Sequence, residues 1–216
     1  MHYRFWGLLD SCLAAIEKHS RINVKNESEN IAKHINCYKS TKPVDGFHLT
    51  TGHILELYDE PEKKEYWICL SPACDLVPEH NEKSSGLISR VRESMPFTAV
   101  QLEKTTIKNA IKNVNHNIFL FLEIDNEIHA FTFHPKGDLK AKPVWEQLIA
   151  EKNGEFEPEG KELQVWRPSG YSEDGMIMQK HTVRVTAQLQ YEYALNLLQR
   201  FGALMTRVGL DFSKPN

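Results

Sequence analysis

The segment with the clearest chemical potential is the pentapeptide SPACD at residues 71–75, which follows an apolar stretch. A thiol and a carboxylate after a strand could form a nucleophilic site, because functional groups often lie on the loops that follow strands. His80 lies five residues beyond Asp75, and a folded-back loop could bring its imidazole to the thiol. The candidate catalytic residues are therefore Ser71, Cys74, Asp75 and His80.

The same pentapeptide also has the composition of a turn. Pro72 fixes φ and ends a strand, Ser71 and Asp75 can hydrogen bond backbone amides, and Cys74 can pack as a small hydrophobe. A carboxylate beside a thiol also opposes its ionisation. We favour the turn interpretation and keep the enzymatic one as the alternative.

Other chemistries have weak sequence support. Each pair of possible metal ligands is separated by four residues, which gives opposite parity in a strand and points the two side chains to opposite faces. These pairs are Cys69/Cys74, His48/His53 and His129/His134. The sequence has no phosphate-binding loop, dinucleotide fingerprint or Gly-x-Ser-x-Gly elbow. We expect no metal and no cofactor, and we expect the four cysteines, Cys12, Cys37, Cys69 and Cys74, to be free thiols.

A basic ridge is the main candidate for anion binding. Lys104, Lys108 and Lys112 recur at four-residue spacing on an expected helix at residues 105–115, and Arg200 and Arg207 lie on the last helix. Such ridges bind anionic partners such as nucleic acid, but they are more often solvated helix faces.

The bulk composition is that of an ordinary globular protein. The 216 residues are 41% hydrophobic and 25% charged, and the formal net charge of −3 gives no general attraction for nucleic acid or anionic membranes. The N-terminal stretch is too polar for a signal peptide, and no apolar run is long enough to span a membrane. We expect a cytoplasmic protein without membrane contact.

The hydrophobic pattern predicts a helical N-terminal segment at residues 1–44 and an α+β domain at residues 45–216. Helices are expected at 4–19, 27–38 with Asn26 as its cap, 105–115, 142–152, and from Tyr191 to Gly209. In the last helix the expected buried stripe is Tyr191, Leu195, Leu198, Phe201, Met205 and Val208. The polar stretch at 80–86 is expected to be a loop.

Strands are expected at 53–58, 66–71, 97–104, on both sides of Asp125-Asn126, and at 162–168 and 180–189. The first two should form a hairpin, and 66–71, apolar on both faces, should be a central strand. Because no βαβ rhythm appears, we expect a strongly curved, mostly antiparallel sheet or partial SH3-like barrel covered by helices.

Three stretches, at residues 51–57, 66–77 and 197–212, resemble an uncharacterised bacterial family with a Thr/Ser-Pro-x-Cys-Asp-Leu strand end and a C-terminal Arg-x-Gly-x-x-Phe. Members often follow a response-receiver-like domain and lie near defence or restriction genes, which implies a role in phage defence. The 44 residues that come first here are too few for a receiver domain. His53 also stands where the family tends to have aspartate. The first hairpin is in addition similar to that of MazF/PemK-type ribonuclease toxins, a likeness of fold alone.

These observations favour a non-enzymatic binding or regulatory module of a bacterial defence or signalling system. Its partner would be another protein, such as the product of a neighbouring gene, or a second copy of the chain. The alternative is an enzyme acting on nucleic acid or a small molecule at residues 71–75.

Overall fold

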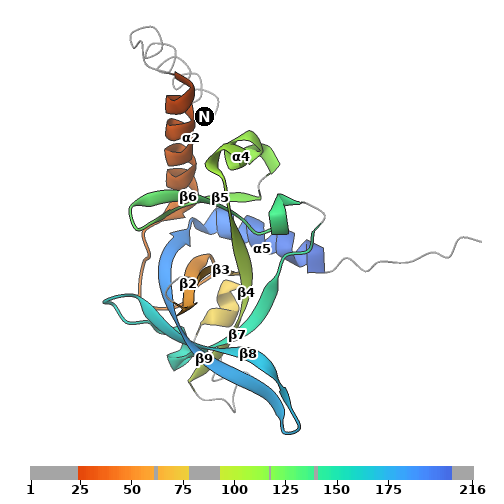
Figure 1. The fold of residues 1–216 in the computed structure, drawn as a ribbon. Helices are drawn as coiled ribbons and strands as arrows, with labels where there is room; N and C mark the ends of the chain where they lie inside the picture. The colour runs from red at the N-terminus through yellow and green to blue at the C-terminus, as the bar shows by residue number, and fades with distance from the viewer. Residues whose placement is uncertain (1–23, 61–62, 78–92, 117, 139–140, 206–216) are drawn as a thin grey trace, which may run out of the picture.

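In the computed structural model, six antiparallel strands close into a barrel (Figure 1). The structure describes residues 24–60, 63–77, 93–116, 118–138 and 141–205. The predicted helix at 4–19, the loop at 80–86, His80 and Arg207 lie outside these residues. The predicted fold class, α+β with a curved antiparallel sheet and a C-terminal helix, is confirmed, and the barrel is closed rather than partial.

The barrel runs in the order β3-β2-β9-β8-β7-β4 and closes where β3 pairs with β4. A hairpin of β5 and β6 extends the sheet from β4, and the short β1 pairs with β9. The strands are β1 (Thr41–Lys42), β2 (His53–Glu60), β3 (Lys63–Cys69), β4 (Ser94–Thr105), β5 (Phe119–Ile124), β6 (Glu127–Thr132), β7 (Trp145–Glu151), β8 (Glu162–Ser172) and β9 (Gly175–Leu189). The α-helices are α2 (Val24–Ser40), α4 (Ile107–Lys112) and α5 (Tyr191–Met205).

Strand alternation divides the apolar residues between the barrel interior and an outer core. On β3, Trp67 and Cys69 point inward, whereas Tyr66 and Ile68 point outward into the core beneath α5 and the β5–β6 hairpin. All four side chains are buried, which confirms that this segment is a central strand. The hairpin of β2 and β3 and the Asp125-Asn126 hairpin are also confirmed.

Ion pairs fasten the tip of the β5–β6 hairpin to the barrel wall. The Glu56 carboxylate is buried and accepts from Arg184 Nε at 2.8 Å and from Lys64 Nζ at 2.8 Å. The same two cations reach Asp125 at the hairpin turn, at 3.4 Å and 3.7 Å. The hairpin is therefore held at a fixed place on the outside of β2, β3 and β9.

The predicted helix at 142–152 is wrong, because most of this segment, Trp145–Glu151, forms β7. Leu148 and Ala150 point into the barrel core, whereas Gln147 and Ile149, which alternate with them, are less buried. Pairing with β4 over seven residues outweighs a local pattern that fits a helix equally well.

The last helix is confirmed as far as Met205. Its predicted stripe is right at Leu198 and Phe201 and wrong at the other described positions, and Val208 and Gly209 lie outside the described residues. Tyr191, Leu195 and Met205 are exposed, whereas the packed face contains Ala194, Leu197, Leu198, Phe201 and Leu204. The helix turns this face inward because Ala194 is small enough to approach Gly52, where an added Cβ would lie 2.7 Å from the Ala194 Cβ. The predicted Asn26 cap is also wrong, since α2 already includes Val24.

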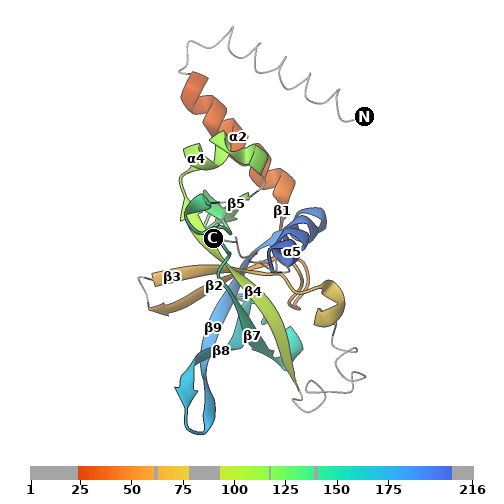
Figure 2. The ribbon, with the colours of Figure 1, turned by 90° about the vertical axis from the view of Figure 1, so that its right-hand side faces the viewer.

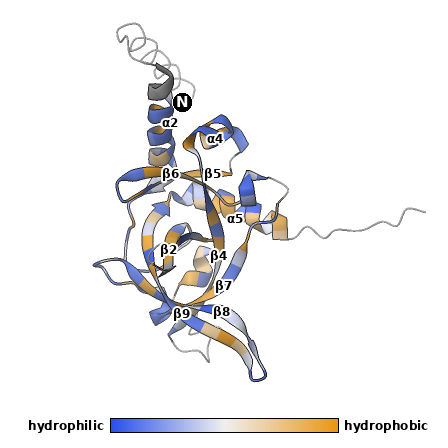
Figure 3. Ribbon diagram, viewed as in Figure 1, coloured by the Kyte–Doolittle hydropathy of each residue, from blue (hydrophilic) through white to orange (hydrophobic). Residues whose placement is uncertain are grey.

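Figures 1 and 2 show three parts of the fold that lie outside the barrel. Helix α2 projects at one end, α5 lies against the wall of the barrel, and the distal part of the β8–β9 hairpin projects from the end opposite α2. Figure 3 shows hydrophobic segments on this projecting part of the hairpin as well as in the barrel.

Candidate functional site

Ser71, which follows β3, connects this strand end to β4 and to the segment that precedes β2. Its Oγ accepts a hydrogen bond from the Thr98 amide at 2.8 Å, and its carbonyl accepts one from Thr51 Oγ1 at 2.6 Å. The preceding Leu70 amide donates to the Thr98 carbonyl at 2.9 Å. The buried Ser71 side chain is therefore bound to β4, which supports an anchoring role for this residue.

Cys74 lies in the short 3-10 helix η1 (Ala73–Leu76) and is exposed, so the prediction that it packs as a small hydrophobe is wrong. Its thiol donates to Asp75 Oδ1 at 3.4 Å. Leu76 supplies the buried contact of this turn instead. Ser71 therefore points inward while Cys74 and Asp75 face solvent, and these side chains do not converge on one point.

The histidines in the described residues do not complete a catalytic set with Cys74. His53 is fully buried at one end of the barrel, where its Nδ1 accepts from the Thr50 amide at 3.1 Å and its ring meets Phe156 edge-on. Burial lowers the pKa of His53 to about 4, so the ring is neutral at pH 7. No histidine in this part of the chain hydrogen bonds to the thiol.

The four anion-binding candidates within the described residues lie on three different elements, β4, α4 and α5. Lys104 belongs to β4 rather than to a helix, and its Nζ lies 5.1 Å from the centroid of the Tyr66 ring. Lys108 and Lys112 are exposed on α4, so the single helical ridge that was predicted does not form. Arg200 donates to Asn196 Oδ1 and to the His116 carbonyl. In the described ranges, no group of three or more His, Cys, Asp and Glu side chains is arranged to hold a metal ion.

A group of exposed apolar residues lies on the distal β8–β9 hairpin, residues 168–179, which we call the arm. β8 last pairs with β7 at Trp166 and β9 begins to pair with β2 at Val183, so the arm is a ribbon of two strands. Tyr171 is 81% exposed, and its cross-strand partner Met176 is 53% exposed. Ile177, also in the arm, is 47% exposed.

Charged side chains fix the base of the arm. Arg167 makes a bidentate pair with Glu146, at 2.6 and 2.7 Å, and also donates to Glu65 at 3.2 Å. On the neighbouring strand, Lys180 Nζ lies 2.8 Å from Glu151, and this contact, chiefly, lowers the pKa of the Glu151 carboxyl. These bonds hold the ribbon in a defined direction and so present its apolar residues outward.

Sequence analysis missed the arm, although a signal was present. The strands were expected to end at residue 168 and to begin again at 180. Glu173 and Asp174 form the turn, and Gly175, at a φ of +127°, follows it and pairs with Ser172. A glycine directly after two acidic residues is a turn signal. The apolar residues after the turn do not alternate with polar ones in the way that predicts a strand, because neither face of the two-stranded ribbon is covered.

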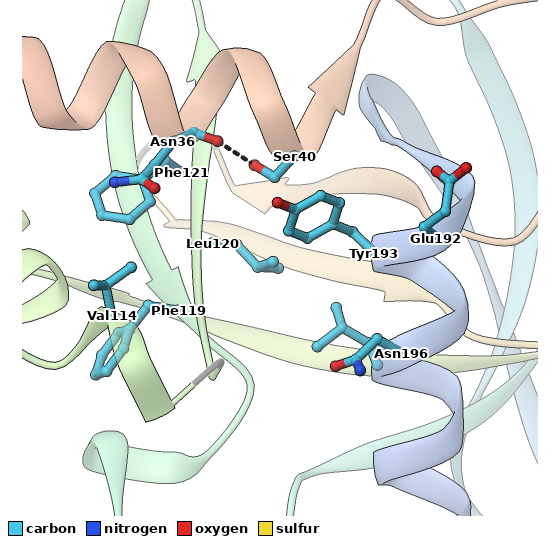
Figure 4. Close-up of a pocket in the computed structure, with 10 residues that line it drawn as sticks. Asn36, Ser40, Val114, Phe119, Leu120, Phe121, Glu192, Tyr193 and Asn196 are labelled. Atoms are coloured by element: carbon cyan, nitrogen blue, oxygen red, sulfur yellow. Dashed lines mark hydrogen bonds between the residues drawn. The ribbon is translucent and has the colours of Figure 1, made fainter. Parts of the chain in front are cut away.

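A recess lies between β5 and α5, next to the last turn of α2 (Figure 4). It has a volume of about 350 Å³, and its lining combines aromatic and aliphatic side chains with several polar ones. The lining residues are Asn36, Ser40, Val114, Phe119, Leu120, Phe121, Glu192, Tyr193, Asn196 and Leu197. Recesses of this size suit a small ligand or a few residues of a peptide.

Comparisons of the chain with protein-family models, with curated proteins and with solved structures find no match. Within the described residues, no helix has both the length and the apolar character needed to span a membrane. The geometry of the chain is thus the basis for inferring what it does.

Proposed function

We propose that this protein is a non-enzymatic binding or regulatory module that acts through protein–protein contacts. The observation that carries the proposal is the arm, where Tyr171, Met176 and Ile177 are exposed on a ribbon that projects beyond the barrel. A soluble protein seldom places a large aromatic and two large aliphatic residues together in water unless a partner covers them.

The position of the arm supports binding by insertion. Its base is held by the Arg167 and Lys180 ion pairs, so little conformational freedom is lost when the arm enters a partner's groove. Its tip carries Glu173 and Asp174, which keep the free arm hydrated. A partner with an apolar groove and a basic end fits this distribution.

The bacterial defence or signalling setting rests on the three sequence stretches that resemble the uncharacterised family. The partner would then be the product of a neighbouring gene or a second copy of the chain. The arm supports contact with a protein in either case.

Co-purification tests the proposal. The wild-type chain and the triple variant Tyr171→Ser/Met176→Ser/Ile177→Ser are produced in the native cells, purified under mild conditions and examined by mass spectrometry and sedimentation velocity. We expect a stoichiometric partner or a self-associated species with the wild type, and its loss with the triple variant.

Tyr38→Ser is the matched control, since Tyr38 is 86% exposed but lies on α2. It should retain the partner. A wild-type chain that stays monomeric and alone at high concentration, or an arm variant that keeps the same partner, would contradict the proposal.

A further inference from the structure

The edge of β5 carries unpaired main-chain groups. β5 is the last strand of the sheet and pairs only with β6 among the described strands. Asp125 and Asn126 both have positive φ and form a two-residue turn, so Ile124 and Glu127, which flank the turn, are a hydrogen-bonded pair.

This register determines which groups point outward. Hydrogen-bonded pairs recur at every second residue, at Leu122 and Leu120. The N–H and C=O groups of Phe119, Phe121 and Glu123 therefore point away from β6. The Glu123 backbone hydrogen bonds to the Cys37 thiol. Within the described residues, the outward groups of Phe119 and Phe121 have no hydrogen-bond partner.

The residues that carry these groups line the recess of Figure 4, next to Asn36 and Ser40 of α2. Phe119 and Phe121 lie on one side of it, and Tyr193 and Asn196 of α5 face them from the other. An edge strand that faces a helix across a recess is the arrangement in which an extended peptide adds a strand to a sheet. Main-chain donors and acceptors at this spacing are satisfied by another main chain.

We infer that the groove between β5 and α5 binds an extended peptide, which pairs with Phe119 and Phe121 as an added strand. This inference goes beyond the proposed function, because the groove and the arm are separate surfaces. Peptide side chains paired with Phe119 and Phe121 would lie on the same face as these rings, and the residue between them would point toward Leu120 and Leu197.

Charge defines the peptide further. Glu192 lines the groove, and its carboxylate has no ion-pair partner in the part of the chain that the structure describes. Arg200 is already bonded to Asn196 and to the His116 carbonyl. The groove therefore favours a peptide with a lysine or arginine that reaches Glu192.

Selection of peptides tests this inference. A phage-displayed library of random 12-residue peptides is selected on the wild-type chain, and an enriched peptide is synthesised with a single N-methyl group at each position in turn. Fluorescence anisotropy should show losses of about tenfold at alternate positions and little change between them, because only every second peptide N–H faces β5.

Matched variants locate the site. Asn196→Trp fills the groove and should weaken binding at least about tenfold, whereas Gln199→Trp, on the exposed side of the same helix, should bind as the wild type does. Glu192→Gln should weaken a lysine-containing peptide by about threefold.

Three results would overturn the inference. These are a selection that enriches nothing, N-methyl losses without alternation, and equal binding by the Asn196→Trp chain. The arm variant with Ser at 171, 176 and 177 should bind the peptide normally, so failure of the arm and failure of the groove are distinguishable.

Discussion

His53 makes the stability of this protein depend on pH in a way that can be worked from the structure. The ring is fully buried, and its Nδ1 accepts from the Thr50 amide. Burial is the main cause that lowers the pKa of His53 from 6.5 to about 4; Gln188 opposes this shift, and the nearby side chains of Lys42, His48 and Lys161 add to it. The proton of the neutral ring is therefore on Nε2.

Proton linkage determines whether the stability of the folded protein rises or falls with pH. The unfolded chain takes up a proton at His53 near pH 6.5, whereas the folded chain does so only near pH 4. The stability associated with His53 is present above pH 6.5 and is lost as pH falls from 6.5 to 4. The full loss is about 3 kcal/mol, and about 2 kcal/mol of it falls between pH 7.5 and 5.0.

Urea unfolding at pH 7.5 and 5.0 measures this loss. His53→Gln keeps an acceptor for the Thr50 amide but cannot be protonated, so its free energy of unfolding should fall about 2 kcal/mol less than that of the wild type. His116→Gln, at an exposed histidine, should retain the wild-type pH dependence. Equal losses for the wild type and His53→Gln would refute the buried neutral imidazole.

Three further substitutions test the fold and the strand end. Ser71→Ala removes the acceptor of the Thr98 amide and should cost about 1–3 kcal/mol in urea unfolding, and a loss below about 0.5 kcal/mol would contradict the anchoring role. Gly52→Ala places a Cβ against Ala194 at a φ of +89° and should cost about 2 kcal/mol or more, whereas Gly46→Ala, also at positive φ but in open space, should cost about 1 kcal/mol; equal costs would argue against the close approach of α5. Cys74→Ser should change stability by less than about 0.5 kcal/mol and leave partner binding intact, and unusually fast alkylation of Cys74 by iodoacetamide at neutral pH would instead favour the enzymatic alternative.

The sequence predicts the elements that follow a clear local pattern. The β2–β3 hairpin, the Asp125-Asn126 turn and the first residue of α5 are signalled by alternation, by turn chemistry and by helical spacing. The curvature of the sheet is indicated by many short strands without βαβ units.

Features set by distant partners could not be predicted. β7 is a strand because β4 pairs with it, and α5 turns Ala194 inward because Gly52 lies beneath it. The exposure of Cys74 depends on Leu76, rather than Cys74, filling the barrel end. The β5–α5 groove joins residues about 70 positions apart in the chain.

Photo-crosslinking from the arm tests the central claim most directly. The photoreactive amino acid benzoylphenylalanine is placed at position 171, or at position 38 as the control, in cells that produce the protein naturally. If the arm binds a protein, irradiation should give one discrete cross-linked product from position 171 and none of that mass from position 38. If position 171 yields no more cross-linking than position 38, the arm is a solvated hairpin and the proposed function is wrong.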